Sequence, residues 1–209
     1  MDEMLPRVLS VNVGNVRTIE WRGRAITTGI WKHAVSGRVE LRGVNFVGDD
    51  QADRVVHGGP DKAVYAYARE DYDYWRDEEH VETSPGLFGE NLTTEGLDLS
   101  RAVIGQRWSV GSTMLEITQP RLPCFKLGIR LNDSHFPKRF MIASRMGAYL
   151  RIVTEGDVGA RDTVCVMNTP EHGVTLSDMV DALRDPAKAA ALRAVPRLPE
   201  FWREVADEA

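Results

Sequence analysis

Arg107-Trp-Ser-Val-Gly-Ser-Thr-Met-Leu-Glu-Ile-Thr-Gln119 contains two short runs of strand-favouring residues, Arg107–Val110 and Met114–Gln119, on either side of Gly111-Ser112. Aromatic and β-branched side chains fit the pleated surface of a strand, and a short loop containing glycine joins antiparallel neighbours. The stretch therefore predicts a β-hairpin in the middle of the chain.

The same pattern of short strands and glycine turns recurs along the first two thirds of the chain. Many short strands with frequent turns are typical of an all-β barrel, so we expect a closed or nearly closed barrel. Two amphipathic segments, 71–80 and 137–146, predict helices at its flanks. The other predicted strands are Val8–Val13, Thr18–Trp21, Ala25–Ile30, Val39–Val44, Ala63–Ala68, Arg151–Val153 and Thr163–Met167.

The pattern becomes helical after residue 168. Thr175-Leu-Ser-Asp178 has the spacing of a capping box, which opens a helix. Asp185-Pro186 is suited to cap a second helix, and Pro199 to open a third. We therefore predict a β-rich domain over residues 1–168 and a three-helix appendage over residues 175–209. The predicted fold class is mainly β with flanking helices (α+β).

Composition limits the classes of partner. Of the 209 residues, 26 are Lys or Arg and 31 are Asp or Glu, which gives a net charge of −5 and disfavours a nucleic-acid partner. No apolar run approaches the roughly 20 residues that span a bilayer, and the first residues lack a secretory signal pattern. The two cysteines are too few for a disulfide framework. We expect a cytoplasmic protein with free thiols and no membrane partner.

Gln119-Pro-Arg-Leu-Pro-Cys124-Phe-Lys126 is the most informative segment for chemistry. Two prolines stiffen the loop around Cys124, and cations such as Arg121 and Lys126 favour the thiolate form of a nearby cysteine. A thiolate is a soft metal ligand or a nucleophile. The alternative is that Cys124 is a small buried side chain, the common state of a free cysteine. Cys165, inside a predicted strand, is expected to be a core residue.

A second polar cluster spans residues 48–62, with Asp49, Asp53, His57 and Lys62 among several glycines. Asp53 and His57 are four residues apart, so one helical turn would bring them together. The alternative is a solvated loop. Weaker signals come from Glu90-Asn91, which follow a glycine and could bind the edge of a ring, and from Lys32 and Arg38, which are possible anion anchors.

Together these segments resemble the MOSC family, and its YiiM-like branch in particular. The resemblance covers nearly the whole chain and implies a distorted β-barrel with a pocket for the molybdenum cofactor (molybdopterin), and a helical C-terminal extension. The run Gly43–Gly48 is less compact than is usual in the family, which leaves substrate choice open. The matching motifs are Val47–Asp53, His57–Tyr67, Pro85–Leu92, Ile104–Trp108 and Gln119–Cys124.

The resemblance also implies roles for individual residues. Cys124 is implied as the molybdenum ligand, and it forms the expected catalytic set with Asp53 and His57. The cofactor's phosphate requires cations, and its pterin ring requires amide and carboxylate partners. The expected cofactor-binding residues are Lys32, Gln51, Asp53, His57, Lys62, Asn91 and Arg121.

The reductive members of the family remove oxygen from N-hydroxylated compounds, including base analogues such as 6-hydroxylaminopurine. The chain has no nucleotide fingerprint for a flavin or nicotinamide and too few cysteines for an iron–sulfur cluster. A separate flavoprotein or other reductase, bound transiently, is therefore expected to supply electrons. The alternatives are a sulfur carrier or transferase with a persulfide on Cys124, a non-catalytic cofactor carrier, and a hydrolytic metal site at Asp49, Asp53 and His57.

Overall fold

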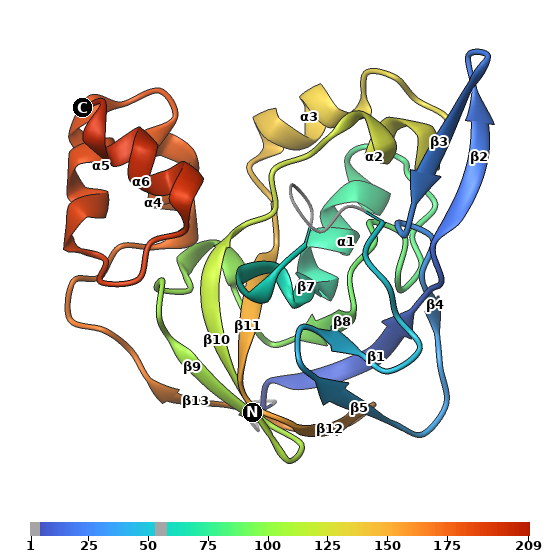
Figure 1. Cartoon of the computed structure of the whole chain (residues 1–209), viewed down its shortest axis with the longest axis horizontal. Coiled ribbons are helices and arrows are strands. Elements are labelled where there is room, and N and C mark those ends of the chain that lie inside the picture. Colours follow the sequence, from blue (N-terminus) through green and yellow to red (C-terminus); the bar gives the residue numbers. More distant parts are fainter. Residues whose placement is uncertain (1–4, 53–57) are drawn as a thin grey trace.

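A curved eight-stranded sheet forms the centre of the computed structural model, which describes residues 5–52 and 58–209 (Figure 1). The strand order is β13-β9-β10-β11-β7-β8-β1-β4, and β7 and β8 form the parallel pair. The strands are β1 (Arg7–Val13), β4 (His33–Ala34), β7 (Val64–Ala68), β8 (Leu92–Glu95), β9 (Arg107–Val110), β10 (Thr113–Pro120), β11 (Ala148–Thr154) and β13 (Val164–Asn168).

The hairpin predicted from the central stretch is present as β9 and β10. Thr113 pairs with Val110, and Met114 with Ser109, across the turn. Gly111 has a φ of 57°, and a Cβ there would lie 2.2 Å from the carbonyl oxygen of Asp157. This turn therefore requires glycine for both its backbone conformation and its close contact.

The expected closed barrel is wrong, although the mainly β fold with flanking helices is confirmed. Within the described residues, β1 meets the chain before β13 through one bridge, Arg7 with Thr163, and not through a continuous ladder. The reason is that the free edge of β1 is divided. Its first residues face the backbone of 161–164, while Asn12 and Val13 pair with β4. The sheet is curved but open.

Two smaller sheets complete the β structure: β12 (Gly156–Gly159) with β5 (Arg38–Arg42) and β6 (Asn45–Phe46), and the projecting hairpin of β2 (Arg17–Trp21) and β3 (Arg24–Thr28) (Figure 1). The strands β4, β6 and β12 were not predicted from the sequence.

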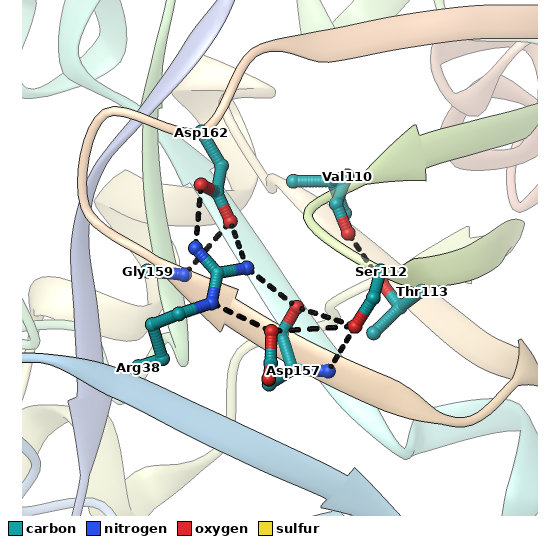
Figure 2. A network of polar contacts seen from close by, with 7 residues as sticks. All are labelled: Arg38, Val110, Ser112, Thr113, Asp157, Gly159 and Asp162. Carbon is teal, nitrogen blue, oxygen red and sulfur yellow. Dashed lines mark hydrogen bonds and ion pairs between the residues drawn. The ribbon is translucent and has the colours of Figure 1, made fainter.

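Arg38 ties the β5–β12 pair to the β9–β10 turn. Its Nε donates to Asp157 at 2.6 Å, and its two terminal nitrogens donate to the carboxylate of Asp162, each at 2.9 Å (Figure 2). The Ser112 hydroxyl donates to the Asp157 carboxylate. Arg38 is therefore a structural cation with two carboxylate partners, and the idea that it anchors an external anion is wrong.

The predicted flanking helices are confirmed as α1 (Arg69–Asp77) and α3 (Phe136–Ala143), while α2 (Phe125–Arg130) was not predicted. Aromatic packing holds α1 and α3 together. The rings of Trp75 and Phe140 stack with their centroids 5.5 Å apart, and Phe88 lies 5.4 Å from Phe140. The chain also contains three short 3-10 turns among the described residues: η1 (Pro60–Lys62), η2 (Leu99–Arg101) and η3 (Leu192–Ala194).

The C-terminal segment forms α4 (Leu176–Ala182), α5 (Pro186–Ala191) and α6 (Glu200–Asp207). Thr175 and Asp178 make the predicted capping box. Trp202 of α6 is fully buried in the same apolar core as the sheet, and its indole N–H donates to Gln119 at 3.1 Å. The C-terminal helices thus pack directly on β10. That residues 175–209 form a domain of their own stays a prediction. No helix among the described residues is both long and apolar enough to cross a membrane.

Candidate functional site

A pocket opens where β10 ends, beside the start of β7, the segment after β3 and the loop before η1. It contains six of the predicted site residues, drawn from five separate stretches of sequence. Asp53 and His57 lie outside the described residues, and the roles assigned to the whole set stay predictions. The predicted residues that line the pocket are Lys32, Gln51, Lys62, Asn91, Arg121 and Cys124.

Cys124 enters the pocket from the turn that joins β10 to α2. The strand ends at Pro120, and Cys124 has an extended backbone (φ −123°, ψ 171°) immediately before the helix. Its thiol is half-buried, so it is accessible from the pocket. It lies close enough to the Arg121 guanidinium for the two to interact electrostatically.

Arg121 is a buried cation at the back of the pocket, with 5% of its surface exposed. Its guanidinium lies 5.8 Å from the centroid of the Tyr65 ring and interacts electrostatically with the Tyr149 hydroxyl. Burial lowers the pKa of Arg121, but interactions with Tyr65, Tyr149 and Cys124 outweigh it and raise that pKa above its ordinary value. Its Nη1 is buried and has no hydrogen-bond partner among residues 5–52 and 58–209, a state that normally costs free energy. An anion in the pocket would satisfy it.

Lys32, Asp49 and Asn91 form a second polar group in the pocket wall. The Lys32 ammonium donates to Asp49, whose other oxygen accepts from the Asn91 amide at 2.9 Å. Burial lowers the pKa of Lys32, an effect that the Asp49 carboxylate opposes. Asn91 also accepts from the Tyr65 backbone N–H at 3.1 Å. Both predicted residues are thus held in place by the fold.

Gln51 lines the pocket, but backbone groups occupy its amide. Its nitrogen donates to the Lys62 carbonyl at 3.0 Å, and its oxygen accepts from the Gly59 N–H at 3.2 Å. Gly59 has a φ of 89°, which glycine adopts without strain. Gln51 therefore fixes the turn that presents Lys62 to the pocket, a role that differs from the expected contact with a pterin ring.

The sequence model of the MOSC domain matches residues 53–165. The chain is 36% identical over 169 residues to Uncharacterized protein YflK from Bacillus subtilis (strain 168), covering 81% of this chain and 76% of that protein. This chain belongs to the MOSC domain family. Protein YiiM from Escherichia coli (strain K12) is 36% identical over 137 residues, or 64% of this chain and 61% of that protein.

A fungal relative and a solved structure extend this MOSC relationship. A protein named Reductase from Gibberella moniliformis (strain M3125 / FGSC 7600) is 31% identical over 167 residues, covering 78% of this chain and 29% of that longer protein. The crystal structure of YiiM from Geobacillus stearothermophilus superposes with a TM-score of 0.80 at 25% identity, covering 97% of this chain and 98% of that one. The structural match to YiiM thus extends over the C-terminal helices, which lie beyond the residues matched by the MOSC model.

Two expectations about individual residues are wrong. Glu90 has no exposed surface and binds no ring edge, because its carboxylate accepts hydrogen bonds from its own surroundings, including Tyr72 at 2.7 Å. Cys165 is exposed and not a core residue, because β13 is an edge strand whose residues after Val164 face outward. Among the described residues, no group of three His, Cys, Asp or Glu side chains could hold a metal ion.

Sequence reasoning missed the two tyrosines of the pocket. Tyr65 and Tyr149 pair across β7 and β11, and both rings lie at the pocket beside Arg121. The signal for Tyr65 was the continuous apolar run Ala63–Ala68, which is typical of a strand covered by protein on both faces. In the structure every residue of this strand is buried. Tyr149 had no comparable signal, because the predicted strand began two residues after it.

Proposed function

We propose that this MOSC protein is a molybdenum-cofactor-dependent reductase of N-hydroxylated compounds, with Cys124 as the metal ligand. The observation that carries the proposal is the buried Arg121, whose unbonded Nη1 lies in the same pocket as the thiol. A thiolate suits a soft, redox-active metal, and a buried guanidinium suits an anionic group. The fungal relative named Reductase supports the reaction class.

The donor set fits molybdopterin in its chemistry. Lys32, Lys62 and Lys126 join Arg121 around the pocket, so an anionic cofactor would meet several cations. The hollow measures about 100 Å³, which is smaller than the few hundred Å³ that ligand pockets usually provide. Binding of the cofactor therefore requires side chains at the rim of the pocket to move apart. Lys126 lines the pocket and is only partly buried, so its side chain is free to move.

When bound, the cofactor would supply a redox-active metal for two-electron chemistry at the N–O bond. The chain's own residues would provide binding and orientation. Cys124 would fix the metal at the end of β10, while Arg121 and Lys62 would hold anionic groups of the cofactor. Asp49 restrains both Lys32 and Asn91, so the charge and hydrogen-bond donors on that wall are preorganised. Reduction of R–NHOH to R–NH2 and water consumes two electrons and two protons, which a separate reductase must supply.

The experiment is to purify the protein from a molybdenum-replete host and add an N-hydroxylated purine with different electron sources. We expect no turnover with NADPH alone, and turnover with dithionite or with a flavoprotein reductase. Many turnovers with NADPH alone would refute the need for a partner. Absence of molybdenum together with an extra sulfur atom on Cys124, detected by mass spectrometry, would instead favour a sulfur carrier, and a molybdenum-loaded protein inert with every donor would favour a cofactor carrier.

A further inference from the structure

A second cavity, of about 510 Å³, lies between the C-terminal helices and the sheet, away from Cys124. Its floor comes from β11 and η1, and its rim comes from η3, α6 and the loop between them. This volume is within the range of small-ligand sites, and the proposed reductase function does not use it. The residues that carry charge there are Asp61, Arg151, Arg193, Arg197, Arg203 and Asp207.

The cavity gathers positive charge in an acidic protein. Four arginines and two aspartates line the cavity, and Glu116 contacts Arg151 from beside it, which leaves an excess of one positive charge, while the whole chain has a net charge of −5. The three rim arginines, Arg193, Arg197 and Arg203, are exposed and form no side-chain ion pair with other described residues. They are therefore available to bind an external anion.

Arg151 lies at the floor with 6% of its surface exposed. One terminal nitrogen lies 2.9 Å from the Asp61 carboxylate, and the other lies 3.3 Å from that of Glu116. Even so, its Nε and Nη1 form no hydrogen bond with any residue that the structure describes, because proximity to a carboxylate does not by itself satisfy the angular requirement of a hydrogen bond. Arg151 thus has two ion pairs, yet its hydrogen-bonding capacity is only partly used, which is unusual for a buried side chain.

A neighbouring hollow of about 160 Å³ shares Arg151 and Arg197 with this cavity and adds His172. The His172 Nδ1 accepts from the Val174 backbone N–H at 3.1 Å, so the neutral ring carries its proton on Nε2. That Nε2 is also buried and has no hydrogen-bond partner in the described part of the chain. Unsatisfied donors thus lie on both sides of the loop that contains Val195 and Arg197.

We propose that this cavity is a binding site for a multiply charged, phosphate-bearing anion such as pyrophosphate. Guanidinium groups present paired N–H donors that match phosphate oxygens, and four of them surround one cavity here. The exposed rim arginines would donate to the anion, and the buried Arg151 would add positive charge at the floor. This site is independent of the proposed reductase function, since none of its residues lines the Cys124 pocket.

The two pockets share the η1 turn, which offers a route by which binding at one would affect the other. Asp61 contacts Arg151 from one side of the turn, and the next residue, Lys62, lines the Cys124 pocket. The Asp61 carbonyl is fixed by the Thr118 hydroxyl at 2.6 Å. An anion that competed with Asp61 for Arg151 would weaken a contact of the η1 turn. The same turn carries Lys62, so the change would reach the wall of the Cys124 pocket.

Calorimetric titration of the full chain with sodium pyrophosphate, at constant ionic strength, tests the site. The test variant is Arg197→Gln/Arg203→Gln, and the control is Arg24→Gln/Arg184→Gln, which removes the same charge from exposed positions outside the cavity. We expect saturable binding in the wild type and the control, and at least tenfold weaker binding in the test variant. No saturable binding in the wild type, or equal affinity in the two variants, would overturn the proposal.

Alkylation of Cys124 tests the link between the two pockets. In a Cys165→Ser background, which removes the exposed thiol, we expect saturating pyrophosphate to change the rate of reaction with iodoacetamide at least twofold. The Arg197→Gln/Arg203→Gln variant should lose that effect. An unchanged rate with pyrophosphate bound would overturn the link.

Discussion

Replacing Glu90 with glutamine tests whether this residue supports the pocket or binds a ligand. One carboxylate oxygen accepts from Tyr72 at 2.7 Å, from the Gly86 N–H at 2.6 Å and from Thr93 at 2.9 Å, and the other accepts from the Phe88 N–H at 3.2 Å. Glutamine keeps one acceptor oxygen for the first three donors. Its NH2 group then faces the Phe88 N–H, so this buried donor loses its nearer acceptor and keeps only the long contact to the Tyr72 hydroxyl at 3.4 Å.

The magnitude follows from that single lost acceptor. A hydrogen bond to a charged group contributes about 1.5–3 kcal/mol, and an unsatisfied buried donor costs a similar amount. We therefore expect Glu90→Gln to lower the free energy of unfolding by about 2–3 kcal/mol. For a chain of 209 residues, each kcal/mol corresponds to about 2–4 °C in the melting temperature, so the expected loss is about 4–12 °C.

Urea unfolding monitored by tryptophan fluorescence measures the change, with Glu82→Gln as the control because Glu82 is exposed in the same loop. The control should stay within about 0.5 kcal/mol of the wild type. An unchanged midpoint for Glu90→Gln, combined with weaker molybdenum retention, would refute the structural role and restore a ligand-binding one.

Three further substitutions test the fold. Trp202→Ala should lower the free energy of unfolding by about 3–5 kcal/mol in a urea titration, because it empties a buried site and leaves Gln119 without its donor; a loss below 1 kcal/mol would contradict this packing. Arg38→Gln should destabilise less. Burial raises the pKa of Asp162, but the interaction with Arg38 outweighs burial and holds that pKa below its ordinary 3.8. The loss of stability in Arg38→Gln should therefore be present above about pH 4 and shrink as the pH falls. A pH-independent loss would argue against the ion pair. Cys165→Ser should leave the melting temperature nearly unchanged, since the thiol is exposed; a large drop would contradict its place on an edge strand.

The sequence predicted the elements with strong local signals and missed those that depend on distant partners. The hairpin of β9 and β10, the capping box at Thr175 and the helix after Ala68 all follow from nearby residues. By contrast, β12 contains Gly156, Asp157 and Gly159, which do not favour strands, and it forms because Arg38 and β5 hold it.

The candidate site shows the same division. Residue types and order pointed to Cys124, Lys62 and Arg121, and the structure brings these side chains to one pocket. The sequence did not indicate which polar groups already have partners. Gln51 and Glu90 were interpreted as ligand-binding residues, but backbone groups of their own loops occupy them, and the sequence alone does not show how those loops fold back.

The most direct test of the central claim is the molybdenum content of protein purified from a molybdenum-replete host, measured by inductively coupled plasma mass spectrometry. Wild type, Cys124→Ser and the matched control Cys165→Ser are compared after the same purification, with folding verified by circular dichroism. A serine hydroxyl is a harder and far less acidic donor than a thiol. We predict near-stoichiometric molybdenum in the wild type and in Cys165→Ser, and at least a tenfold lower content in folded Cys124→Ser. Equal molybdenum in all three proteins would contradict the assignment of Cys124 as the metal ligand.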